Sequence, residues 1–198
     1  FGSERSLMDM LNALNALDFN VVVTVPAVQN TAYFDALLGQ AMAAYVIPYG
    51  WWRRNVPISE PVIGTFCSAI AADSVDVVHV NPIMLREPLL AARRMGIRGI
   101  VHVRELIRHD DALLEIMGET PDEIVAGVWD SADLLIANSQ ATCAGFEDDG
   151  RLPVVVYNTA DMDDLRALDA PGGPGPLRVA MISSNIPKKG VWDFCEVA

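Results

Sequence analysis

Short runs of aliphatic residues alternate along the chain with longer segments of helical periodicity. Leu7, Leu11 and Leu14 recur on one face of a helix, and the mostly valine run at 20–25 follows them. A short apolar run without polar alternation is typical of a strand that is buried on both faces of a parallel sheet. The same pattern predicts further strands over residues 44–47, 75–80, 98–103, 133–137, 153–157 and 177–183.

Most segments between these strands carry the spacing of amphipathic helices. The pattern predicts helices over residues 31–42, 61–72, 85–95, 112–117, 122–131 and 140–146. Gly96 directly follows one of them, which favours a left-handed helix cap. Strands connected through helices form right-handed crossovers that place the helices on both faces of a parallel sheet. The fold class predicted is therefore α/β, with a Rossmann-like parallel sheet.

One stretch interrupts the alternation and predicts a domain boundary. Residues 169–176 read DAPGGPGP, a concentration of glycine and proline that neither a helix nor a central strand accepts. We interpret this stretch as a linker between a first domain over 1–168 and the beginning of a second domain over 177–198. The second domain then starts with a strand, a loop and a helix.

Composition and charge exclude several classes of protein. Hydrophobic residues make up 52% of the chain and charged residues 20%, so the chain is not disordered. No apolar run reaches the length of about 18 residues that a transmembrane segment needs. A net charge of -12 argues against nucleic acid as a partner. Three widely spaced cysteines predict free thiols, and hence a reducing, cytoplasmic location.

The common motifs of cofactor and metal chemistry are absent from the sequence. It contains no GxGxxG after a strand, no GxxxxGK[ST], no CxxC, no HExxH and no GxSxG. The sequence therefore predicts no cofactor and no metal site.

The candidate functional residues follow the predicted strands. Ligands of open parallel sheets bind outside the carboxyl ends of the strands. The polar residues at such positions, together with the turn that opens the chain, are Gly2, Ser3, Glu4, Asn81, Arg104, Glu105, Asn138, Ser139 and Asn158, and His102 lies one residue before the end of its strand.

Each of these residues also has a purely structural explanation. Asn138 or Ser139 would serve as the cap of the helix that follows. His79 and His102 lie within strands, where a histidine is commonly a packed core residue. Arg104 and Glu105 would be solvated or paired with a neighbour, and His109 would lie at the surface. Only their joint position at one edge of the sheet favours function.

The ordered series of segments resembles a known family of enzymes. The segments are GSER at the head of a helix, VHVNPIMLREPLLAARRMGI, IVHVREL, ADLLIANSQAT, VVVYNTADM and NIPKKG. Together they resemble the N-terminal half, linker and first strand-loop-helix of a retaining glycosyltransferase with two Rossmann-like domains, of the GT-B type and similar to family 4. Such an enzyme moves a sugar from a nucleotide-sugar donor to a glycan or small-molecule acceptor.

The resemblance implies roles for particular residues. Gly2, Ser3 and Glu4 match a turn whose amides approach the donor diphosphate. His102 matches a histidine near the transferred sugar, and Lys189 matches a lysine that contacts the donor phosphate. The resemblance places the asparagines and serine at 138, 139 and 158 near the cleft.

Two features depart from the family pattern. Residues 183–185 read Ser-Ser-Asn, where the family commonly has an arginine before the lysine. The paired glutamates that hold donor sugar and ribose would lie beyond Ala198, so a fragment of this extent is expected to be inactive alone. The family also has a strand before the GSER turn, and we expect either such a strand before Phe1 or its replacement by residues 177–183.

Other functions remain open from the sequence. A non-catalytic sugar-phosphate-binding module or scaffold has the same fold, because a fold alone does not fix chemistry. An epimerase or a phosphorylase with the same two-domain architecture is a further alternative.

Overall fold

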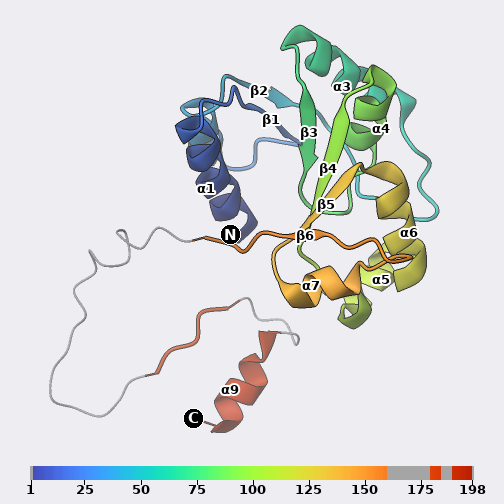
Figure 1. Ribbon diagram of the computed structural model, residues 1–198. Helices are drawn as coiled ribbons and strands as arrows, with labels where there is room; N and C mark the ends of the chain where they lie inside the picture. Colours follow the sequence, from blue (N-terminus) through green and yellow to red (C-terminus); the bar gives the residue numbers. More distant parts are fainter. Residues whose placement is uncertain (1, 160–178, 184–188, 198) are drawn as a thin grey trace, which may run out of the picture. The chain divides into compact units, whose positions relative to one another are not determined.

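The computed structural model describes residues 2–159, 179–183 and 189–197. The chain divides into two units, Phe1–Ala160 and Asp161–Ala198 (Figure 1). All the strands of the described residues belong to the first unit, whereas the second contributes helix α9 (Val191–Val197). The predicted linker at 169–176 lies outside the described residues.

The first unit begins with a small two-stranded sheet. Its elements are α1 (Gly2–Ala16), β1 (Val22–Val25), α2 (Thr31–Leu38) and β2 (Ala43–Val46). Strands β1 and β2 pair in parallel, and Leu11, Val23 and Leu37 form the buried core between them and the two helices. The side chain of Asn30 caps α2 by accepting the N–H of Tyr33. The predicted helices and strands of this part are confirmed, with α2 ending four residues early.

A four-stranded parallel sheet forms the larger part of the first unit. Its strands are β3 (Val77–Val80), β4 (Arg98–Val103), β5 (Leu134–Ala137) and β6 (Val154–Val155), in the order β3-β4-β5-β6. All three pairings are parallel. The predicted α/β class with parallel strands is therefore confirmed, although β6 is much shorter than the run at 153–157 predicts.

Helices cover this sheet chiefly on one face. They are α3 (Glu60–Ala72), α4 (Glu87–Met95), η1 (Ile107–His109), α5 (Asp111–Met117), α6 (Pro121–Ser131) and α7 (Gln140–Gly145). Figure 1 shows α3, α4 and α6 on one side of the strands and α1 on the other. Gly96 ends α4 with φ of 72°, which confirms the predicted left-handed cap.

The strand register decides which residues meet on the opposite face. Val101 and Val103 point into the large core that contains α6, so the residues between them point the other way. His79 pairs with Ile100 across β3 and β4, which puts both on the face opposite to that core. His102 follows Ile100 by two residues and therefore lies on the same face as His79.

Two features differ from the expected single sheet. Within the described residues β1 and β3 are not paired, so the strands form two sheets. Residues 179–183 form no strand, and Val179 and Ile182 are 66% and 99% exposed, so the expected buried strand is not found there. A strand pairs its backbone N–H and C=O groups with a neighbouring strand, and none of the described strand pairings includes residues 179–183. A strand before Phe1 stays a prediction.

Candidate functional site

His102 is the most buried polar residue among the predicted site residues. Its side chain is only 7% exposed, and neither ring nitrogen has a hydrogen-bond partner in the described structure. A buried polar atom that lacks a partner costs free energy, so these nitrogens are groups that a ligand or an ordered water would satisfy. They lie near the carboxyl end of β4, where a parallel sheet binds its ligands.

His79 lies beside His102, although the sequence alone favours a packed core residue at this position. The two imidazole rings stack with their centroids 5.7 Å apart. Nε2 of His79 is also buried without a partner. The signal that could have found this pair is the repeated Val-His-Val in two neighbouring strands, because equal positions in adjacent strands share a face.

Arg104 brings a positive charge to the histidine pair. Its Nη2 donates a hydrogen bond of 2.6 Å to Oγ of Ser6 in α1, while its buried Nε has no partner. Ser6 and Arg104 are 98 positions apart, and no sequence motif points to their contact. This hydrogen bond fixes α1 against the carboxyl end of β4.

Burial and charge together keep the histidines neutral. Burial lowers the pKa of His102 to about 4, and the neighbouring charges of Arg104 and His79 act in the same direction. Burial also lowers the pKa of His79, again assisted by Arg104. A neutral imidazole offers one N–H donor and one nitrogen acceptor, which is the pair of functions that a sugar hydroxyl matches.

Glu105 completes the cluster with a partly buried acid. Its Oε2 accepts the backbone N–H of Arg104 at 3.0 Å. Burial raises the pKa of its carboxyl, while the backbone N–H and the charge of Arg104 lower it. The structure thus brings together His102, Arg104 and Glu105 of the predicted set.

Asn138 and Ser139 have the structural role that the sequence left open. Oγ of Ser139 caps α7 by accepting the N–H of Thr142 at 3.1 Å. Oδ1 of Asn138 accepts the hydroxyl of Thr142 at 2.9 Å. The N–H of Asn138 also meets the carbonyl of Val103 at 3.4 Å, so this pair borders the end of β4.

The remaining predicted residues belong to other segments of the chain. Gly2, Ser3 and Glu4 form the first turn of α1, rather than a turn ahead of it. Asn81 follows β3, and Asn158 is exposed after β6. Lys189 is exposed in the second unit. His109 is exposed, as predicted.

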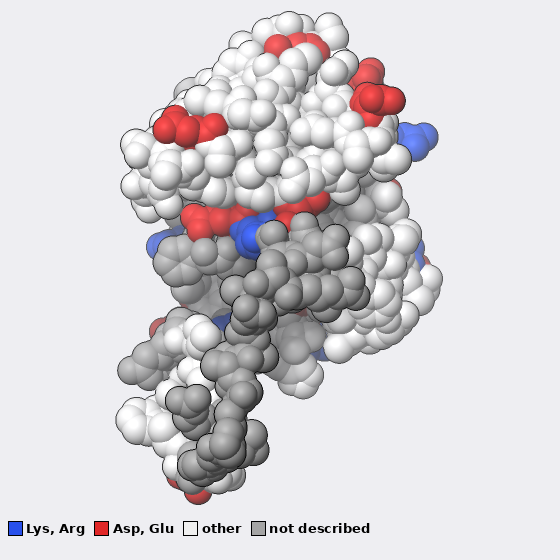
Figure 2. Space-filling model, turned by 90° about the vertical axis from the view of Figure 1, so that its left-hand side faces the viewer, with Lys and Arg blue, Asp and Glu red and all other residues white. Residues whose placement is uncertain are grey.

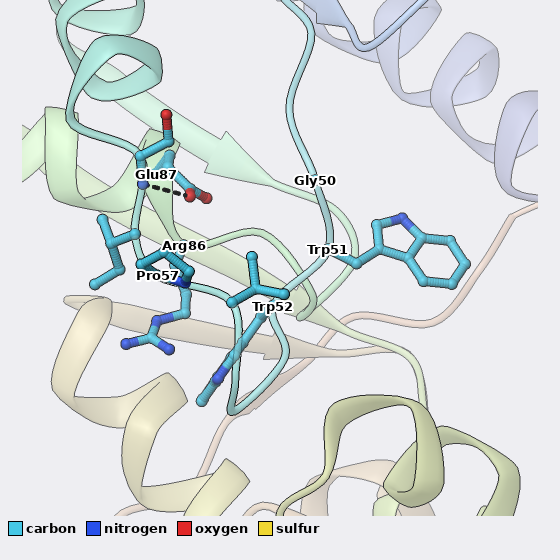
Figure 3. Close-up of a pocket in the computed structure, with 9 residues that line it drawn as sticks. Gly50, Trp51, Trp52, Pro57, Arg86 and Glu87 are labelled. Carbon is cyan, nitrogen blue, oxygen red and sulfur yellow. Dashed lines mark hydrogen bonds between the residues drawn. The ribbon is translucent and has the colours of Figure 1, made fainter.

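A hollow lies elsewhere on the first unit, in the loop between β2 and α3. It measures about 460 Å³ and is lined by Gly50, Trp51, Arg53 and Val56. A smaller hollow beside it extends to Arg86 and Glu87 (Figure 3). The sequence reasoning passed over this loop, although its Trp-Trp-Arg-Arg segment is unusual in composition.

Metal chemistry has no support in the part of the chain that the structure describes. Those residues contain no group of three or more His, Cys, Asp or Glu side chains placed to hold a metal ion. The three cysteines are free thiols, with Cys143 buried and Cys195 exposed.

With this geometry in place, comparisons with known proteins identify the class. The sequence model of Glycosyltransferase Family 4 matches residues 2–164, so the chain belongs to that family. No curated protein sequence matches. The crystal structure of MurG from Acinetobacter baumannii resembles the chain with a TM-score of 0.52 and 15% sequence identity.

The extent of that structural match identifies the part of the fold. It covers 79% of this chain and 41% of the MurG chain. The chain therefore has the fold of the N-terminal portion of a GT-B glycosyltransferase, as the sequence resemblance implies. Among the described residues, no helix is both long enough and apolar enough to cross a bilayer.

Proposed function

We propose that this chain is the acceptor-side portion of a retaining glycosyltransferase that uses a nucleotide-sugar donor. Family membership supports transfer of a sugar, and the neutral, unpaired His102 at the carboxyl end of β4 is the observation that supports a sugar-binding site there. The acceptor is a glycan or a small molecule, and the location is the cytoplasm. The reaction needs no metal or cofactor.

The chemistry assigns distinct tasks to the residues of the site. The bond between the anomeric carbon and the donor phosphate oxygen breaks, the acceptor oxygen bonds to the same face of that carbon, and the acceptor proton passes to the departing phosphate oxygen. His102 bonds to a hydroxyl of the transferred sugar through one of its two ring nitrogens. Because these nitrogens are covered, donor binding must displace a covering side chain. Arg104 and Glu105 border this position.

The leaving diphosphate needs separate stabilisation because negative charge grows on it as the bond breaks. Gly2, Ser3 and Glu4 lie in the first turn of α1, and the positive end of a helix dipole at this N-terminus favours the negative diphosphate. Lys189 is the residue that the family resemblance assigns to the donor phosphate. Asn81, Asn138, Ser139 and Asn158 line the acceptor side.

Release of a nucleoside diphosphate tests this function. We expect the full-length protein, given a panel of nucleotide sugars and candidate acceptors, to release diphosphate and to form a glycoside with the anomeric configuration of the donor. Binding of donors without release would favour a non-catalytic sugar-phosphate-binding module instead. A product of inverted configuration would contradict retention.

A further inference from the structure

The loop between β2 and α3 presents two tryptophans in opposite directions. Trp52 is buried, at 7% exposed, whereas the adjacent Trp51 is 51% exposed. Figure 3 shows their side chains on opposite sides of the loop. Adjacent residues of extended backbone point to opposite sides, so an anchored Trp52 directs Trp51 outward.

Trp52 is held by contacts of its ring and of its backbone. Its Nε1 donates to Oε1 of Glu119 at 3.3 Å, and the guanidinium of Arg86 lies 4.5 Å from its ring centroid. Its backbone N–H donates to the carbonyl of Met84 at 2.7 Å. These contacts place the loop beside the segment that follows β3, at the carboxyl edge of the sheet.

The backbone around Arg53 is also held in place, but the Arg53 side chain has no ionic partner within the described part of the chain. The N–H of Arg54 donates to the carbonyl of Met117 at 2.8 Å, so the backbone is fixed on both sides of Arg53. Arg54 pairs with Glu123, whereas the exposed Arg53 forms no ion pair with any residue that the structure describes. The two cations therefore differ in availability.

The unpaired cation is notable on an acidic protein. The chain has a net charge of -12, and Asp and Glu side chains are prominent on the face that Figure 2 shows. Trp51, Arg53 and Val56 line the same open hollow. Exposed Val56, at 50%, extends the apolar surface next to Trp51.

We propose that Trp51 and Arg53 bind a saccharide that carries an anionic group, and that this saccharide is the acceptor. The indole face packs against the C–H face of a pyranose, and the guanidinium pairs with a carboxylate or phosphate on the same sugar. Arginine matches both anions in a bidentate manner. The inference rests on the proposed function only in naming the ligand as the acceptor, because saccharide binding here requires no donor.

Selective labelling makes the binding directly measurable. The full-length protein is labelled with ¹⁵N-tryptophan, and the Trp51 indole signal is assigned by its loss in Trp51→Phe. The labelled protein is titrated with methyl β-D-glucuronide, glucose 6-phosphate and methyl β-D-glucoside. We expect an anionic sugar to shift the Trp51 signal at lower concentration than the neutral glucoside. The stronger of the two anionic sugars identifies carboxylate or phosphate.

Two variants separate the charge of Arg53 from general effects. Arg53→Gln should weaken anionic sugar binding about tenfold, the scale of one charged hydrogen bond, and should bring it to the level of the glucoside. Arg54→Gln, which removes the neighbouring paired cation, should leave the preference intact. Equal affinity for neutral and anionic sugars would overturn the anionic class, and an unmoved Trp51 signal in all titrations would overturn the site.

The outcome is separable from that of the proposed function. Diphosphate release with an unmoved Trp51 signal would remove this saccharide site and leave the transferase. Sugar binding at Trp51 without diphosphate release from any donor would keep the saccharide site and remove the transferase function.

Discussion

The imidazole rings of His79 and His102 lie stacked, with their centroids 5.7 Å apart and their planes inclined by 13°. They come from adjacent strands and share the sheet face opposite to the large core. Protonation of either ring would place a cation beside the other and beside Arg104. The pair is therefore arranged to remain neutral.

The neutrality of His102 is measurable by titration. We expect its ring signals in NMR spectra to titrate with a pKa of about 4. Because the folded pKa lies below the ordinary value of 6.5, the unfolded chain binds the proton first. The free energy of unfolding should therefore fall as the pH drops from about 6.5 to 4.

A matched variant isolates this contribution from that of the carboxylates. His102→Gln, which cannot be protonated, should show a smaller fall of the unfolding free energy over the same pH range. Parallel pH profiles for the two proteins would be incompatible with a buried neutral His102.

Removal of the Arg104 charge should raise the pKa of His102. Burial is the largest cause of the lowered pKa and Arg104 is the next, so Arg104→Gln should move the pKa upward without restoring it to the ordinary value. Arg108→Gln is the control, because Arg108 is exposed and pairs with Asp122. NMR titration measures the pKa of His102 in both variants. An unchanged pKa in Arg104→Gln would show that the Arg104 charge does not act on His102.

Two glycine-to-alanine substitutions test the seat of Trp52. A Cβ at Gly127 in α6 would lie 2.5 Å from Cη2 of Trp52, so Gly127→Ala should lower the free energy of unfolding by about 1–2 kcal/mol. At Gly64 in α3 a Cβ meets nothing within 4 Å, so Gly64→Ala should raise the free energy of unfolding by about 0.5–1 kcal/mol. Chemical denaturation measures both, and equal effects would show that Trp52 does not pack closely on α6.

The cap at Ser139 has a characteristic pattern of rescue. Ser139→Ala removes the acceptor for the N–H of Thr142 and should cost about 1 kcal/mol of unfolding free energy. Ser139→Asp should recover most of that loss, because aspartate also caps helices. Exposed Ser68→Ala is the control, with a change within about 0.5 kcal/mol. Equal losses for the alanine and aspartate variants of Ser139 would show that capping is not its role.

The fold was largely predictable because its strands are uniformly apolar. The valine-rich runs at β1, β3 and β4 predict strands, and the structure confirms each. The run at 177–183 has the same composition, yet residues 179–183 form no strand. An apolar composition allows a segment to form a strand, but the strand forms only where a neighbouring strand pairs with it.

The candidate site was predictable only in part. The end of β4 marked His102, Arg104 and Glu105, because each follows or closes an apolar run. The contact of Arg104 with Ser6 and the anchoring of Trp52 depend on tertiary contacts between distant segments, for which one sequence has no periodic signal. Ser139 matched both a cap and a site residue, and the structure confirms the cap.

The central claim is that sugar transfer depends on the unpaired, neutral imidazole of His102. Its most direct test is the rate of nucleoside diphosphate release by the full-length protein carrying His102→Ala, compared with His109→Ala, which alters an exposed histidine of the same chain. The account predicts that His102→Ala loses most of the activity, by about 100-fold or more, while His109→Ala retains it. Near-normal release by His102→Ala would contradict the account.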